Sequence, residues 1–152
     1  MFSKTTEYAL RATIFIAQKG TPERKLGIEE ISLAIDSPRP FTAKILQMLT
    51  KDNKVISSVR GPHGGFYMTD ASKLLPLKSI IDALEEHSVL KKCVLGLKKC
   101  SEINPCPLHA EYKIIRESMV QLFENKTIGE TALKTNAKDI FINNTPLDLA
   151  KI

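Results

Sequence analysis

Residues 55–68 read VISSVRGPHGGFYM, and across them the sequence changes from a helical to a strand-like period. Two short strand-like runs, 55–59 and 65–68, flank the segment Arg60-Gly61-Pro62-His63-Gly64. Glycine and proline between two runs rich in β-branched and aromatic residues are typical of a β-hairpin. We therefore predict a hairpin here, with Arg60, Gly61 and His63 at its tip.

Three helices are predicted before this hairpin. The first, residues 3–19, is apolar on most sides, which is typical of a central, buried helix. A short helix over 28–35 carries isoleucines at positions i, i+3 and i+7, and a turn at 36–38 separates it from a third helix over about 40–52. Helix, short helix, turn, helix and hairpin follow one another in the order of a winged helix-turn-helix.

Three further helices are predicted after the hairpin. Residues 70–76 are expected to form a connector that leads into a short amphipathic helix over 77–86. A long helix begins at Pro107, with apolar residues at heptad-like spacing that serve either packing within the domain or a dimer seam: Leu108, Tyr112, Ile115, Met119 and Leu122. Thr127 with Glu130 resembles a capping box for a last short helix.

These elements predict a mainly α protein, a winged helix-turn-helix with a long C-terminal dimerisation helix. We expect a DNA-binding domain over 1–86, a cysteine-containing loop over 87–106, the dimerisation helix and short last helix over 107–130, and a tail over 131–152.

Composition narrows the class of protein. The chain has 152 residues, of which 43% are hydrophobic and 26% charged, as in an ordinary globular protein. It has no uncharged apolar run of the roughly 18 residues that a membrane span requires. Glu7 and Arg11 beside the first apolar run argue against a signal peptide, so a cytoplasmic protein is expected. Three cysteines, an odd number, favour thiol or metal chemistry over a disulfide framework.

The charge of the chain indicates a polyanionic partner. The net charge is +5, and residues 37–69 carry five basic residues against one acid. Alone this pattern is typical of a solvated face, but combined with the element order it favours double-stranded DNA. The third helix would enter the major groove, with Arg39, Phe41, Thr42 and Lys44 nearest the bases. Arg60 would reach phosphate or a narrow minor groove, and Gly61 and His63 beside it on the hairpin tip are also expected to contact DNA.

The cysteines and one histidine form a candidate metal site: Cys93, Cys100, Cys106 and His109. No two of the cysteines stand two to four residues apart, as they usually do in zinc modules, so the spacing favours a larger inorganic core. Four lysines and no acid between 88 and 101 would favour thiolates. Zinc, or three unrelated cysteines, remain the alternatives.

Three segments resemble the Rrf2 family of winged-helix transcription regulators: Tyr8-Ala9-Leu10-Arg11, residues 57–66, and Cys106-Pro107-Leu108-His109. The similarity spans about residues 1–130, and the cysteine triplet is typical of the iron–sulfur branch. The resemblance implies a homodimer whose long helices pair, a 2Fe-2S or 4Fe-4S cluster in the loop, and promoter affinity set by the cluster. It implies His109 as fourth ligand, with the partner subunit's Glu7 as the alternative.

Other members of this family lack the cysteines and respond to a small molecule or a partner enzyme, so a zinc-bound or cofactor-free regulator is the second hypothesis. An iron–sulfur carrier would have no need of the basic hairpin. The sequence lacks a phosphate-binding glycine loop, a catalytic triad with supporting context and paired carboxylates in an apolar frame, so no enzyme is predicted.

Overall fold

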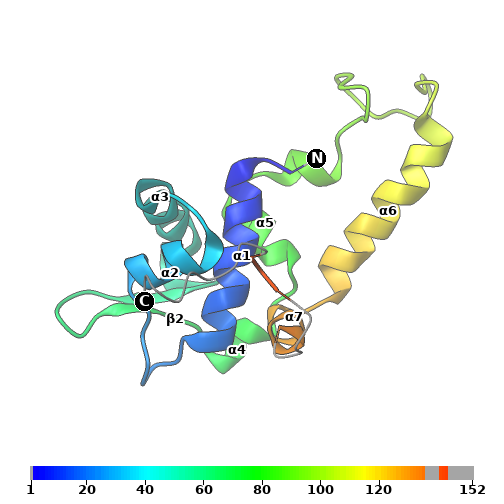
Figure 1. Cartoon of the computed structure of the whole chain (residues 1–152). Coiled ribbons are helices and arrows are strands. Elements are labelled where there is room, and N and C mark those ends of the chain that lie inside the picture. The colour runs from blue at the N-terminus through cyan, green and yellow to red at the C-terminus, as the bar shows by residue number, and fades with distance from the viewer. Residues whose placement is uncertain (1, 136–140, 144–152) are drawn as a thin grey trace.

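The computed structural model describes residues 2–135 and 141–143. The chain is mainly helical, and one small hairpin projects from one side of the helices (Figure 1). The α-helices are α1 (Lys4–Lys19), α2 (Ile28–Ile35), α3 (Arg39–Leu49), α4 (Asp70–Lys73), α5 (Lys78–Ala83), α6 (His109–Asn125) and α7 (Ile128–Lys134). Two 3-10 segments are η1 (Lys51–Asn53) and η2 (His87–Leu90), and the strands are β1 (Ser57–Val59) and β2 (Gly65–Tyr67).

Helix α1 lies at the centre of the fold. Its Ala9, Ala12 and Ile16 have no exposed surface, and α2, α3, α5, α7 and β2 all pack against it. The Ser3 side chain caps the helix by accepting a hydrogen bond from the Thr6 N–H at 3.1 Å. The small alanines let neighbouring helices approach closely, which explains why the sequence of α1 is apolar on most sides.

Helices α2 and α3 form the helix-turn-helix. Asp36, in the left-handed conformation at φ 52°, ends α2, and Pro38 precedes the first turn of α3. Helix α3 ends at Leu49 rather than near Asp52 as predicted. Asp52 and Asn53 also have positive φ, at 58° and 48°, and an α-helix cannot continue through left-handed residues.

The hairpin follows as predicted from the sequence. Its strands pair antiparallel, with Ser57 opposite Tyr67 and Val59 opposite Gly65. The hairpin is also bonded to the segment before α2: the Leu26 N–H donates to the Phe66 carbonyl at 2.8 Å, and the Phe66 N–H donates back to Leu26 at 2.9 Å. These bonds hold the hairpin, which is the wing of the fold, against the helical core. A two-stranded hairpin alone would be only marginally stable.

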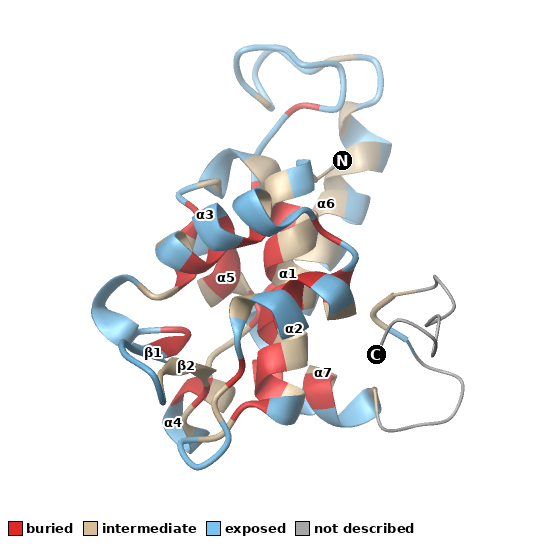
Figure 2. Cartoon of the chain, turned by 60° about the vertical axis from the view of Figure 1, so that its left-hand side comes forward, coloured by how far each residue is buried: buried red, intermediate tan, exposed pale blue. Residues whose placement is uncertain are grey.

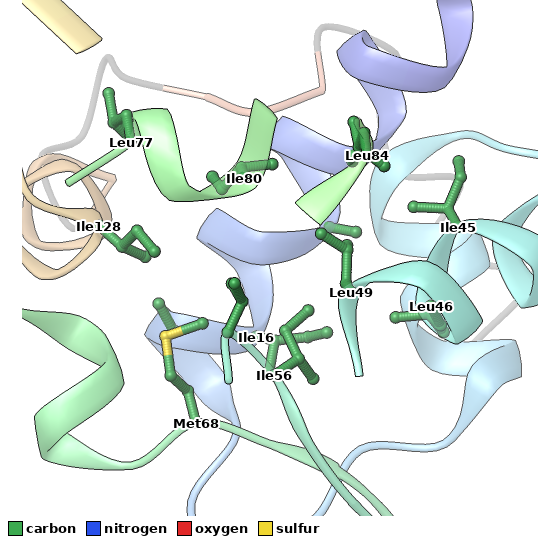
Figure 3. Packing of buried hydrophobic residues seen from close by; sticks show 14 of the residues in the cluster. Ile16, Ile45, Leu46, Leu49, Ile56, Met68, Leu77, Ile80, Leu84 and Ile128 are labelled. Carbon is green, nitrogen blue, oxygen red and sulfur yellow. The ribbon is translucent and has the colours of Figure 1, made fainter. Parts of the chain in front are cut away.

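One hydrophobic core joins elements that are far apart in the sequence. Ile45 and Leu49 from α3 meet Ile80 from α5 and Ile128 from α7 in the same cluster (Figure 3). Each of these four side chains is at most 1% exposed. Burying an aliphatic side chain of this size stabilises the fold by about 1.5–3 kcal/mol.

Helix α6 projects away from this core, and its C-terminal end leads back to α7, which packs on the core (Figure 1). The Leu77 N–H donates to the Lys126 carbonyl, and the Ile128 N–H donates to the Leu75 carbonyl, both at 2.9 Å. Helix α7 starts with the predicted Thr127–Glu130 capping box and packs on α1. The division drawn from the sequence groups α7 with α6, whereas α7 packs within the core of the helix-turn-helix.

Two further predictions concern the C-terminal tail over 131–152 and the absence of a membrane-spanning segment. Residues 136–140 and 144–152 of the expected tail lie outside the described residues. Within the part of the chain that is described, no helix is long and apolar enough to cross a membrane.

The core assignment can be tested on two isomeric side chains of α2, Ile31 and Leu33, which are 0% and 67% exposed. Ile31→Ala should lower the free energy of unfolding by about 2–5 kcal/mol, because it leaves a cavity. Leu33→Ala should change it by no more than about 0.5 kcal/mol. Urea denaturation at one fixed protein concentration measures both, and equal losses would contradict the burial of this helix face.

Candidate DNA-binding surface and cysteine site

The exposed face of α3 carries three of the predicted DNA-contacting residues. Lys44 is exposed on the middle of the helix. Phe41 is half-buried, with its ring edge-on to Tyr8 at a centroid distance of 5.5 Å. Arg39 is exposed but forms an ion pair with Glu29 at 2.7 Å, so contact with DNA would require it to exchange that carboxylate for a phosphate.

Thr42 does not lie on this face. It has no exposed surface, and its hydroxyl donates to the Pro38 carbonyl at 3.1 Å. The expectation that Thr42 contacts a base is therefore corrected. A side chain of α3 near the N-terminus can equally face the core, and Thr42 lies one turn before Ile45 and Leu46, which are buried.

The tip of the wing holds the other predicted residues. Arg60, Gly61 and His63 are all exposed. Gly61 has φ 103°, a conformation that other residues rarely adopt. A side chain on Gly64 would place its Cβ 2.1 Å from the Val59 carbonyl oxygen. The two glycines thus permit a tight turn that presents Arg60 and His63 to solvent at the end of the hairpin.

The loop between η2 and α6 brings the four candidate ligands together in two pairs. The sulfurs of Cys93 and Cys106 lie 3.9 Å apart. The sulfur of Cys100 lies 3.2 Å from Nδ1 of His109. His109 opens α6, and its N–H donates to the Cys106 carbonyl at 3.0 Å, which holds both pairs at the start of the helix.

Hydrogen-bond donors lie beside one sulfur of each pair. Hydrogen bonds from the backbone N–H groups of Leu97 and Leu95 lower the pKa of the buried Cys93 thiol, with smaller contributions from Cys106 and Gly96. Arg116, two turns into α6, donates from a guanidinium nitrogen to the Cys100 sulfur at 2.8 Å. That bond raises the pKa of Arg116. The arrangement around Cys93 favours its thiolate, the form in which cysteine binds metals.

The pairs do not close into one site. Among the described residues, no three or more His, Cys, Asp or Glu side chains gather in a way that could hold a metal ion. The Nε2 atom of His109 is buried without a hydrogen-bond partner in that part of the chain. Three thiols and one imidazole are nonetheless the donor types that iron–sulfur clusters use, so the chemistry of the donors fits such a group.

Glu7, the alternative ligand, lies apart from the loop on α1. Its carboxylate bonds to Lys4 at 2.9 Å, and this bond lowers the pKa of Glu7. Within the described residues of its own chain, Glu7 makes no bond to the four candidate ligands.

The sequence-based prediction missed Arg116. Its position, seven residues after His109, places it near the same helix face two turns later, and that spacing was the available signal. Contact between Arg116 and Cys100 depends on how the loop folds back on α6, where Lys113 also bonds to Glu102.

The sequence of this chain is similar to a family model and to two named regulators. The family model described as "Rrf2: Iron-dependent Transcriptional regulator" matches residues 2–132. A protein of Aquifex aeolicus (strain VF5), named as an HTH-type transcriptional regulator, is 33% identical over 132 residues, which cover 86% of this chain and 90% of that protein. The HTH-type transcriptional regulator IscR of Klebsiella pneumoniae (strain 342) is 27% identical over 90 residues, covering 59% of this chain but only 55% of that protein.

Solved structures share the fold. CymR, the global cysteine regulator of B. subtilis, superposes with a TM-score of 0.68 at 18% identity, covering 89% of this chain and 98% of that chain. IscR of T. potens gives a TM-score of 0.64 at 17% identity, covering 90% and 88%. These likenesses confirm the predicted mainly α winged-helix fold.

The pairing of the cysteines predicts the product of mild oxidation of the metal-free protein. Cys93 and Cys106 should join in a disulfide, because closing their 3.9 Å separation to about 2.05 Å needs only a small movement of the loop. Peptide mapping should find this link and a free Cys100 thiol, and Cys100→Ser should leave the link unchanged. A disulfide that contains Cys100 would contradict the observed pairing.

Proposed function

Because this chain belongs to the Rrf2 family of transcriptional regulators, we propose that it binds promoter DNA as a homodimer and that an iron–sulfur cluster sets its affinity. The observation that carries the proposal is the position of the thiols and the imidazole at the start of a long, exposed helix that is tied to the DNA-binding core at its other end. The relatives are regulators rather than enzymes, and no catalytic role is assigned to any residue.

The DNA-binding part of the proposal rests on Lys44 and the wing. Lys44 on α3 and Arg60 on the hairpin tip are both exposed cations on elements of one packed core. A helix fits the major groove, while a basic hairpin can follow the flanking backbone. Gly61 lets the wing backbone come close to phosphates, and His63 adds a donor beside Arg60.

The dimer part rests on α6. Ile114, Ile115 and Leu122 are 67%, 59% and 51% exposed, although they are large and apolar. Figure 2 shows this helix exposed along much of its length, whereas α1 is mostly covered. Phe123, which follows the last residue of the heptad-like stripe, is not available to a partner, because it is buried against Phe2 with a centroid distance of 5.5 Å. Pairing of two α6 helices would cover the exposed isoleucines and the leucine.

The cluster part assigns Cys93, Cys100, Cys106 and His109 as ligands. A cluster, when bound, supplies a redox-active and oxidant-sensitive centre whose charge depends on its ligands. The chain would hold it with the Cys93 thiolate, which backbone N–H groups favour, and with the Cys100 sulfur, to which Arg116 donates a hydrogen bond, while His109 would offer an imidazole nitrogen. Because His109 begins α6 and the three cysteines lie in the loop that leads into it, a change at the loop would act on the helix that we assign to the dimer.

A second candidate is a regulator of the same family that binds zinc or no cofactor and responds to a small molecule or partner enzyme. The two separate donor pairs favour it, since one Cys–Cys and one Cys–His contact need no metal. Its fold is that of CymR as well as IscR.

Arg60→Ala should weaken binding to a DNA duplex selected by the wild-type protein from a random pool. We expect a loss of about tenfold or more, and a decrease of about 0.9 in the slope of log affinity against log salt for each phosphate contact removed. Lys134→Ala, which removes one exposed cation from α7, is the matched control and should change neither value. Unchanged binding of the Arg60 variant would remove the wing from the interface.

The fourth ligand can be identified by comparing His109→Ala with Glu7→Ala, purified separately without oxygen. Loss of His109 should alter the visible spectrum and the stability of the cluster, because a nitrogen ligand is replaced by solvent. Loss of Glu7 should leave both unchanged. The reverse pattern would assign the ligand to the partner subunit's Glu7, and a colourless wild type with stoichiometric zinc would overturn the cluster itself.

A further inference from the structure

A pocket of about 630 Å³ lies beside the cysteine loop. Its lining includes Lys91, Lys92, Lys98 and Lys99 together with Cys93 and Cys100. This volume lies within the range of small-molecule sites, about 300–1,000 Å³, and is too small for a folded partner. The pocket therefore combines four cations and two thiols in a space suited to a small ligand.

The positive charge of this pocket is not neutralised by its own loop. Residues 88–101 contain no acid, and none of the four lysines forms an ion pair within the described residues. The carboxylates on either side are engaged elsewhere: Glu86 accepts from Ser3 at 2.9 Å and from Thr6, and Glu102 bonds to Lys113. A cleft lined by one sign of charge concentrates ligands of the opposite sign.

The two thiols of the pocket differ in whether a group attached to the sulfur would be displaced by a neighbouring thiol. Cys93 is 5% exposed and has the Cys106 sulfur 3.9 Å away, so a group attached to Cys93 would be displaced by Cys106. Cys100 is half-buried, and its close neighbours are the Arg116 guanidinium at 2.8 Å and His109 at 3.2 Å. Neither neighbour can displace a group bound to its sulfur. Cys100 is thus the thiol on which an adduct would persist.

We propose that this pocket binds small anionic disulfides and that Cys100 forms a mixed disulfide with them. The Cys100 sulfur attacks one sulfur of the bound disulfide, the ligand's S–S bond breaks, and a new S–S bond forms between Cys100 and one half of the ligand. The other half leaves as a thiol or thiolate, and it or solvent takes the cysteine proton. The disulfide is the only oxidant required.

This reaction goes beyond the proposed function, because it gives the metal-free chain its own chemical input. A simple anion such as phosphate would account for the lysines but not for the thiols beside them. A neutral or cationic disulfide would account for the thiols but would gain nothing from the lysines. An anionic disulfide matches both features of the lining.

The test uses the reduced, metal-free, full-length chain and three disulfides: the dianion 5,5′-dithiobis(2-nitrobenzoate), neutral 2-hydroxyethyl disulfide and the dication cystamine. Each rate is divided by that reagent's rate with N-acetylcysteine amide, which removes intrinsic reactivity. At low salt the normalised rate at Cys100 should be about tenfold or more higher for the dianion than for the dication. The difference should shrink as salt is added.

Lys98→Gln/Lys99→Gln should reduce the preference, and Lys51→Gln/Lys54→Gln, which removes two exposed cations next to α3, should leave it intact. Circular dichroism confirms that each variant is folded, and Lys91→Gln/Lys92→Gln replaces the first variant if it is not. Peptide mapping should place the adduct on Cys100. Equal normalised rates, a preference that survives loss of the lysines, or an adduct retained on Cys93 or Cys106 would each overturn the proposal. These readouts need no cluster, so they are independent of the test of the proposed function.

Discussion

The packing of four helices and a strand around α1 is the constraint on which the rest of the structure depends. Ala9, Ala12 and Ile16 give α1 a surface that neighbours can cover from several sides. Because α7 takes part in this packing, the chain must return to the core after residue 126. The backbone hydrogen bonds Leu77–Lys126 and Leu75–Ile128 hold the two ends of the segment between residues 77 and 126 next to each other in space. Helix α6 and the cysteine loop therefore project from the core as one segment whose two ends are joined by backbone hydrogen bonds.

That arrangement connects three surfaces through one packed core. The exposed faces of α3 and the wing lie on the core, α6 leaves from it, and the cysteine loop joins η2 to α6 (Figure 1). A shift of the loop can act on the core only along α6 or through the short segment after α5. The surfaces proposed for DNA, for a second copy and for the cluster are thus separate in space but mechanically linked.

Local patterns in the sequence were sufficient to predict most of the helices and the hairpin. The glycine-rich hairpin, the capping box at Thr127 and the period of α1 and α6 depend on neighbours within a few residues, which is why they could be predicted. Long-range contacts could not. Thr42 faces the core because of how α3 packs against its neighbours, and α7 pairs with α1 across more than a hundred residues. The candidate ligands were named from spacing, but their division into Cys93–Cys106 and Cys100–His109 depends on the path of the loop.

We propose that the cysteine loop is the point where a chemical signal becomes a change in DNA affinity. The most direct measurement is the affinity of the anaerobically purified protein for its selected duplex, taken before and after the bound metal is removed, at one salt concentration. The account predicts a visible chromophore in the first sample and affinities that differ by about tenfold or more, which corresponds to a coupling free energy of roughly 1.4 kcal/mol. Equal affinities in the two samples, with the chromophore present only in the first, would contradict it.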